Sequence, residues 1–249
     1  MMDETINLKS LIYAGGVEPA SQENKCVLGE GIRSKYGNRY LGSKGKRFSI
    51  REFESLVSIE DITDYAYERL KVVGSGSSRV AFILSQKYVL KVARDSDGVG
   101  PDNTDRGTSQ NRAEWNVWKT ATPLAKSVLP KVLKAEEFSY YWIISELCRP
   151  IKSEEDFKEV SGFDFEELLD FLHHMKYQFP DDNNSFIYAN KTIRSISELI
   201  KVSNLSSDEM GSLDQWGKTA DGRLVLLDSG GTHDVLETYY TVVDSGWDS

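Results

Sequence analysis

The stretch from Val72 to Asp95, VVGSGSSRVAFILSQKYVLKVARD, constrains the fold more than any other part of the sequence. It contains three apolar runs of strand length, rich in the β-branched and aromatic residues that favour strands. Glycine and serine residues, which are common in tight turns, separate the first two runs, and a polar Ser-Gln-Lys turn precedes the third. The stretch therefore predicts three strands in a meander.

Lys91 is an exception to this pattern, because it lies in the middle of the third apolar run, VLKVA. An ammonium group is costly to bury unless it meets an anion. We therefore expect Lys91 to have an anionic partner.

The composition excludes several classes of protein. A chain of 249 residues can form one large domain or two lobes with separate cores. The formal charge of -9 argues against a surface that coats nucleic acid. Cys26 and Cys148 suggest no disulfide framework, the N-terminus lacks the features of a signal peptide, and no apolar run has membrane-spanning length. We expect a cytoplasmic protein that makes no membrane contact.

The first half of the chain predicts a sheet with few helices. Residues 1–48 read as an irregular, basic N-terminal extension. Ser49 with Glu52 and Ser58 with Asp61 have capping-box spacing and predict two short helices before the strands. Residues 95–111 are polar and glycine-rich and predict a loop, which NRAEWNVWKTA follows as a helix. Two more strands in KVLKAEEFSYYWIISEL complete a five-stranded antiparallel sheet, with one long helix inserted after its third strand.

The second half predicts mainly helices. Ser153 with Asp156 and Asp164 with Glu167 have the spacing of helix N-caps, and a third helix begins near Asn190. The late apolar run GRLVLLDSGG then predicts a strand that stops abruptly at its aspartate.

The order of these features resembles the protein-kinase fold over roughly residues 70–232. More narrowly, GSGSSRVAF, VLKVA, QNRAEW and DQWGKTADGRLVLLDSG resemble segments of small phage-encoded kinase-like proteins. The resemblance implies an α+β fold of two lobes. Residues 49–148 would form the N-lobe, with its sheet and helix, and residues 149–249 a reduced, mostly helical C-lobe.

The resemblance also implies a nucleotide site for ATP. Lys91 matches the lysine that pairs with phosphate oxygens, and Glu114 matches the helix glutamate that holds this lysine. Glu146 and Leu147 occupy the hinge position that meets adenine, by position only. The residues implied for the phosphate-binding loop are Gly74, Ser75, Gly76, Ser77, Ser78 and Arg79, with Arg79 in place of a third glycine. Each motif taken singly has an ordinary alternative. The turn is then a simple hairpin, Lys91 a surface-facing lysine and Glu114 a solvated glutamate.

Two carboxylates are implied as ligands of Mg²⁺. Asp228 matches the aspartate of the Asp-Phe-Gly motif, with Ser229 in place of phenylalanine. Asp214 stands at the position of the asparagine that binds a second Mg²⁺ in kinases. The alternative for Asp228 is a turn-capping aspartate.

The catalytic loop departs from the kinase pattern, because SSDEMGSLDQWG lacks its histidine and arginine. Counting back from Trp216 places Glu209 at the catalytic aspartate, one methylene longer than the usual residue. Asp208 is the neighbouring alternative, and the sequence does not choose between them.

Two functions follow from the resemblance. In the first, Lys91, Glu209 and Asp228 serve an ATP- and Mg²⁺-dependent phosphotransferase, a minimal serine/threonine kinase acting on a host or phage protein. In the second, the chain is a pseudokinase that binds a partner without chemistry. The retained lysine, glutamate and two candidate metal carboxylates favour the first function. The altered catalytic loop favours the second, as does the short segment after Gly231, in which we expect no peptide-docking helices.

Overall fold

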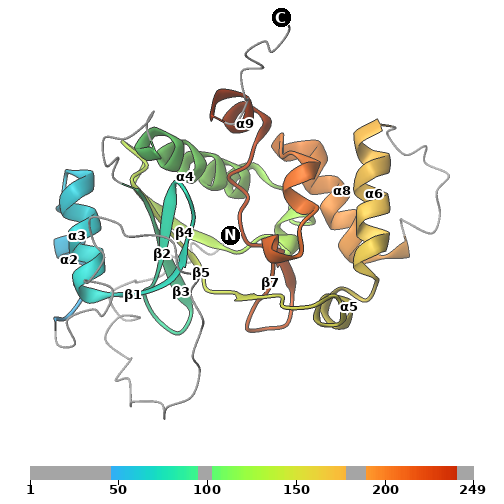
Figure 1. The fold of residues 1–249 in the computed structure, drawn as a ribbon, viewed down its shortest axis with the longest axis horizontal. Coiled ribbons are helices and arrows are strands. Elements are labelled where there is room, and N and C mark those ends of the chain that lie inside the picture. The colour runs from blue at the N-terminus through green and yellow to red at the C-terminus, as the bar shows by residue number, and fades with distance from the viewer. Residues whose placement is uncertain (1–45, 95–102, 178–188, 240–249) are drawn as a thin grey trace, which may run out of the picture.

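The computed structural model describes residues 46–94, 103–177 and 189–239. These ranges form helices and two antiparallel sheets (Figure 1). The predicted N-terminal extension lies outside the described residues up to residue 45.

The larger sheet has five antiparallel strands in the order β1-β2-β3-β5-β4, which confirms the predicted sheet. Successive residues of a strand face opposite sides of a sheet, so alternate residues such as Val89 and Lys91 share a face. The register places Ala81 beside Lys91 and Ser145 beside Val89 on that face. The strands of the larger sheet are β1 (Lys71–Ser75), β2 (Arg79–Ile83), β3 (Tyr88–Ala93), β4 (Val132–Ala135) and β5 (Trp142–Glu146).

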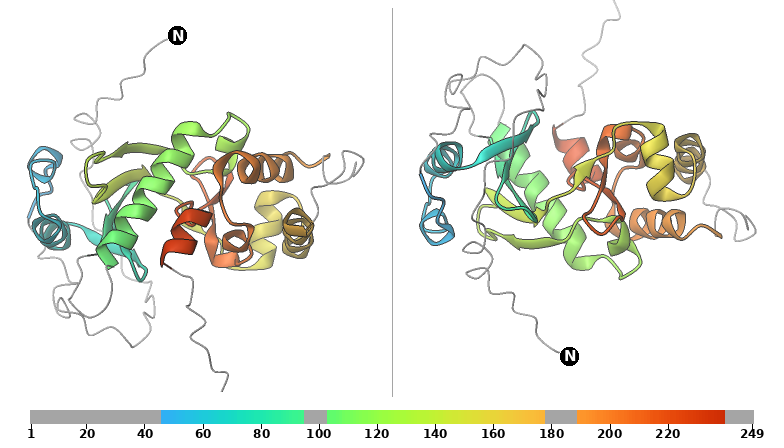
Figure 2. Two further views of the ribbon diagram at one scale, coloured as in Figure 1. Left: turned by 90° about the horizontal axis from the view of Figure 1, so that it is seen from above. Right: turned by 90° about the horizontal axis from the view of Figure 1, so that it is seen from below.

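Two short helices, α2 (Ile50–Phe53) and α3 (Ile59–Arg69), cover one face of this sheet (Figure 2). Both begin at the predicted caps, since Ser49 Oγ accepts from Glu52 N and Ser58 Oγ accepts from Asp61 N. Their apolar sides pack on the sheet in one core. That core contains Phe53, Ile62, Ala66, Tyr67, Val80, Phe82, Leu90, Val92, Trp142 and Ile144.

The long helix α4 (Asn103–Thr120) lies on the opposite face of the sheet, where Trp115 and Trp118 pack against Ile143. The predicted loop over 95–111 was wrong from residue 103 onward, because those residues are helical. Tertiary contacts outweigh the weak local propensity of this segment. Gln110 accepts a hydrogen bond from Ser78 Oγ, and Gly107 packs directly on the hairpin of β2 and β3.

Gly107→Ala is expected to destabilise the protein, although the same change inside a helix ordinarily stabilises it by about 1 kcal/mol. A Cβ at this position would lie 2.4 Å from Ser78 O and 2.8 Å from Ala93 Cβ. Overpacking of this kind costs about 1–3 kcal/mol in the free energy of unfolding, which urea denaturation measures. The control is Gly76→Ala, where the nearest atom to the added Cβ is 3.8 Å away. A free energy of unfolding that rises in Gly107→Ala would contradict the close approach of α4.

The helices of the second half pack in another apolar core, to which the end of α4 and residues 125–129 also contribute. The predicted helix starts are confirmed, because Ser153, Glu167 and Asn190 each accept hydrogen bonds from backbone N–H groups at those starts. The helices are α5 (Glu154–Ser161), α6 (Phe165–Tyr177), α8 (Lys191–Ser203) and α9 (His233–Tyr239). A small sheet joins β6 (Arg149–Pro150), β7 (Trp216–Lys218) and β8 (Leu224–Leu226). Of these strands, the sequence indicated only the last.

The helices in the described ranges are all too short or too polar to cross a bilayer.

Candidate functional site

A cleft of about 430 Å³ lies between the face of the large sheet that carries Lys91 and the segments that flank β7 and β8. The hairpin residues 74–79 form one wall, and the sheet contributes Ala81, Val89, Lys91 and Ser145. The rest of the lining comes from the chain after β5 and from the second half, with Glu146, Leu147, Cys148, Pro150, Glu209, Gln215, Leu227 and Asp228. Most of the site residues predicted from the sequence therefore meet in one cleft.

Four charged side chains form an ion cluster at the inner end of this cleft. Lys91 Nζ lies 2.7 and 2.9 Å from the two carboxylate oxygens of Glu114. Arg79 donates to Glu114 Oε2 at 2.9 Å and pairs with Asp228 Oδ1 at 2.5 Å. The Glu114 side chain is 2% exposed and that of Arg79 is 8% exposed, so these two groups are shielded from water. The anionic partner expected for Lys91 is Glu114.

Lys91 also joins the two halves of the chain. An ammonium group has three donors, and Lys91 uses two on Glu114 and the third on Leu227 O at 2.8 Å. The residue after Leu227 is Asp228, so this bond holds the end of β8 against β3.

The cluster shifts the pKa values of Asp228 and Arg79. Burial alone would raise the pKa of Asp228, but the positive charges of Arg79 and then Lys91 outweigh it and hold that pKa well below its usual range. Burial likewise acts against the charge of Arg79, and Asp228 and Glu114 outweigh it, so the pKa of the guanidinium is raised. Asp228 is therefore an anion and Arg79 a cation at neutral pH.

The hairpin is held from outside the cleft. Arg94 donates to Gly76 O at 2.7 Å and also to Ser75 Oγ. Gly76 N donates to Arg79 O at 2.9 Å, which closes the turn. Side chains added at Gly74 or Gly76 would make only ordinary contacts, and within the described residues the glycines with positive φ are Gly162 and Gly222. The fold itself therefore places no demand for glycine at these two positions.

Glu209 also lines the cleft. Its segment runs beside the chain that follows Asp228, because Leu205 pairs with Thr232 and Ser206 N donates to Gly231 O. A Cβ at Gly231 would lie 2.5 to 2.7 Å from atoms of the Glu209 side chain. Partial burial raises the pKa of Glu209, and the charges of Asp228 and then Asp208 raise it further.

The structure does not bring Asp214 to Asp228. Asp214 is exposed, its carboxylate accepts a hydrogen bond from Ser212 Oγ at 2.6 Å, and it is not among the residues that line the cleft. Its neighbour Gln215 lines the cleft instead. Within the described part of the chain, no group of three or more His, Cys, Asp or Glu side chains is arranged to hold a metal ion. The expected pair of magnesium ligands is therefore not assembled here.

The predicted hinge residues line the cleft, but both of their N–H groups are engaged within the protein. Glu146 N donates to Lys131 O and Leu147 N donates to Lys87 O, each at 2.8 Å. The next residue, Cys148, also lines the cleft, and burial followed by the charge of Glu146 raises the pKa of its thiol to about 12. The thiol is therefore protonated and unreactive at neutral pH.

Sequence reasoning missed Ser145 and Gln215. The Ser145 side chain is buried, its Oγ has no hydrogen-bond partner, and it lines the cleft beside Val89. The available signal was a polar residue within the apolar run WIIS. A signal of the same kind distinguished Lys91 in VLKVA. Nothing in the pattern around Gln215 distinguished it from Asp214.

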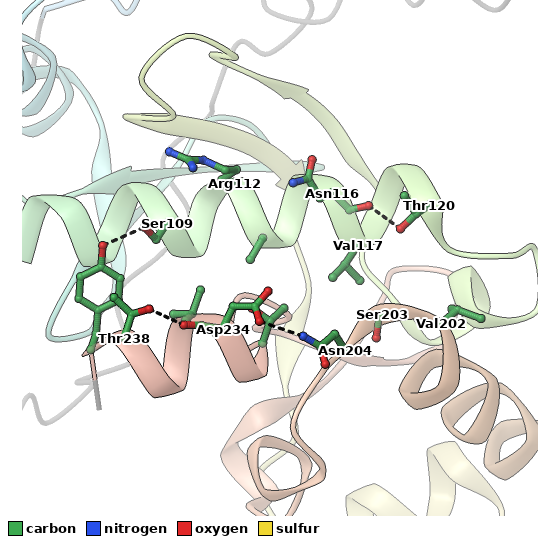
Figure 3. A pocket seen from close by; sticks show the side chains of 14 residues that line it. Ser109, Arg112, Asn116, Val117, Thr120, Val202, Ser203, Asn204, Asp234 and Thr238 are labelled. Atoms are coloured by element: carbon green, nitrogen blue, oxygen red, sulfur yellow. Dashed lines mark hydrogen bonds between the residues drawn. The ribbon is translucent and has the colours of Figure 1, made fainter. Parts of the chain in front are cut away.

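A second groove of about 420 Å³ lies between α4, the end of α8 and α9 (Figure 3). Its polar groups largely bond to one another: Asn204 donates to Asp234, and Ser109 Oγ lies 3.2 Å from Tyr239 Oη. It contains none of the site residues predicted from the sequence.

Comparison with known proteins identifies no family for this chain. No protein-family model matches the sequence, and no curated protein matches it. Among solved structures, the crystal structure of WbdD is similar, with 18% sequence identity and a TM-score of 0.35. The likeness covers 64% of this chain and 31% of the WbdD chain, about a third of that protein's length. A likeness of this degree does not bear on function.

Proposed function

We propose that the chain is a kinase-like phosphotransferase with two lobes, residues 49–148 and 149–249, that binds ATP in the cleft. The observation that carries the proposal is the ion cluster. A strand lysine and a helix glutamate, Lys91 and Glu114, form an ion pair that Arg79 links to Asp228, beside a cleft walled by a glycine-serine hairpin. Strongly perturbed charged groups in a cleft are a mark of functional sites.

The glycines of the hairpin support phosphate binding. Neither Gly74 nor Gly76 is required by backbone conformation or by packing within the chain. Without a Cβ, however, the backbone of such a turn lets the phosphates of a nucleotide approach closely. A ligand explains these glycines better than the fold does.

The inner wall of the cleft supports binding of a nucleobase. Ala81 and Val89 supply small apolar surface, and the buried Ser145 hydroxyl supplies a donor and acceptor that the protein itself leaves unused. A buried polar group without a partner is costly, so a ligand that bonds to it gains affinity. The polar edge of adenine has both donors and acceptors for this purpose.

The proposed reaction transfers the γ-phosphoryl group of ATP to a serine or threonine hydroxyl of a host or phage protein. Glu209 accepts the proton of the hydroxyl, the acceptor oxygen bonds to the γ-phosphorus, and the bond from that phosphorus to the β–γ bridging oxygen breaks to release ADP. The raised pKa of Glu209 suits a general base, because proton transfer is most efficient when the pKa of the base approaches the working pH.

Magnesium, which the kinase resemblance implies, does not fit the described arrangement. Asp214 lies outside the cleft, and Oδ1 of Asp228 already meets Arg79 and the N–H of Gly230. The same pairing favours a second candidate function, a pseudokinase that binds nucleotide and a protein partner without transferring phosphate.

ATP is expected to raise the melting temperature of the full chain. A ligand that binds only the native state stabilises it by about 2.7 kcal/mol at a hundred times its dissociation constant, which a thermal scan detects. Ser145→Leu adds bulk to the sheet wall of the cleft and should remove most of the shift in melting temperature. The matched control is Ser109→Leu, which alters the other groove. If millimolar ATP, with or without Mg²⁺, leaves the melting temperature unchanged, the proposed function is wrong.

A further inference from the structure

We infer that Arg79 supplies the positive charge that neutralises Asp228, so that the cleft binds the phosphates of ATP without a divalent cation. The inference rests on the proposed function, because it requires nucleotide in this cleft. It starts from the 2.5 Å contact between the Arg79 guanidinium and Asp228 Oδ1. In the kinase resemblance this carboxylate faces a metal ion, whereas here it faces a side chain of the protein.

The charges of the cluster balance without an added ion. Arg79 and Lys91 carry two positive charges, and Glu114 and Asp228 carry two negative charges. An unpaired aspartate at this position would repel the phosphates of ATP, and in kinases the metal removes that repulsion. Because Arg79 already pairs with Asp228, the repulsion is removed before any ligand arrives.

Arg79 is held in place by a buried support and is not a chance surface pair. One terminal nitrogen donates to Glu114 and to Asn111 Oδ1, while the other reaches Asp228. Asn111 is fully buried, and its own amide donates to Tyr140 O at 2.8 Å. The planar, forked guanidinium can span two carboxylates in this way, whereas a lysine ammonium is a compact charge that cannot.

The carboxylates that could hold a divalent cation in the cleft are few, and some are already paired. Asp228 Oδ1 also accepts from Gly230 N at 2.9 Å, so this oxygen has two donors. Asp214 is exposed outside the cleft. Glu209 is the remaining carboxylate of the lining apart from Glu146, whose oxygen pairs with Arg223. Mg²⁺ in a nucleotide site usually binds one or two protein carboxylates, and the one expected at the end of β8 is already paired with Arg79.

Titration calorimetry of the full wild-type chain with ATP tests the inference directly, once in excess EDTA and once in Mg²⁺. We expect dissociation constants that agree within about threefold, because the charge on Asp228 is compensated in both conditions. Binding that requires Mg²⁺, or that is tightened more than about tenfold by it, overturns the inference and leaves the proposed function standing. If ATP binds in neither condition, the proposed function fails and the inference fails with it.

Variants at Arg79 and Asp228 make the same test on this ion pair. Arg79→Lys keeps the charge but loses the two-carboxylate bridge, so metal-free affinity for ATP should fall at least about tenfold. Arg69→Lys is the matched control, since Arg69 pairs with Glu68 at the end of α3 and does not line the cleft, and it should bind ATP in EDTA nearly as the wild type does. Asp228→Asn, which removes the charge that Arg79 compensates, should retain metal-free binding. Loss of metal-free binding in Asp228→Asn would contradict the inference.

Discussion

Replacing Glu209 with glutamine is expected to lower the rate of phosphate transfer by about a hundredfold to ten-thousandfold, the usual contribution of a general base. Glutamine keeps the size of the side chain and its packing against Gly231, but it cannot accept the acceptor's proton. ATP binding should change little, because Glu209 belongs neither to the hairpin nor to the ion cluster. Single-turnover assays with labelled ATP, on the protein itself and on host extract, measure the rate.

Asp208→Asn is the matched control for Glu209→Gln. Asp208 is exposed and does not line the cleft, so its replacement should leave the transfer rate within about threefold of wild type. The reverse ranking would show that the base is Asp208. Equal rates in both variants would mean that neither residue is the base, and absence of transfer in the wild type would favour the pseudokinase.

Replacing Glu114 with alanine is expected to lower the free energy of unfolding by about 3–5 kcal/mol, because it leaves two buried cations without their shared anion. Asp228 would be the one carboxylate left in the cluster, and the other partners of Arg79 and Lys91 would be the neutral oxygens of Asn111 and Leu227. Denaturation in urea at neutral pH measures the loss.

Glu54→Ala provides the contrast for Glu114→Ala. Glu54 also forms an ion pair, with Lys134 at 2.6 Å, but both side chains are about a third or more exposed. Surface pairs of this kind contribute less than about 1 kcal/mol. Equal losses in the two variants would show that burial of the Glu114 cluster adds nothing to stability.

The sheet and most helix starts could be predicted because their signals are local. The strand runs, the turn residues and the capping serines each act over a few positions, and the structure confirms them at Ser49, Ser58 and Ser153. The start of α4 could not be found in this way. Its first turns are polar and contain Gly107, and they are helical because of contacts with the β2–β3 hairpin, which are distant in sequence.

The candidate site was predictable where a charged residue conflicted with its apolar surroundings. Lys91 in VLKVA required an anion, and Glu114 supplies it. Spacing alone was a weaker guide in the loop before β7. Counting placed Asp214 in the site, but the short 3₁₀ turn Leu213–Gln215 directs Asp214 outward and leaves Gln215 at the cleft. The roles assigned to these residues remain predictions for the experiments above.

The bond from Lys91 to the Leu227 carbonyl joins positions 136 residues apart, and this separation orders events during synthesis. Chains fold progressively as they leave the ribosome, N-terminal segments first. While the second half is still being made, Arg79 and Lys91 share only Glu114, so the nascent cluster carries one excess positive charge. Asp228 cancels that charge only when β8 emerges. The cleft is thus completed only after β8 has been synthesised, and a nascent chain that stops before β8 has the hairpin without a neutral cluster beside it.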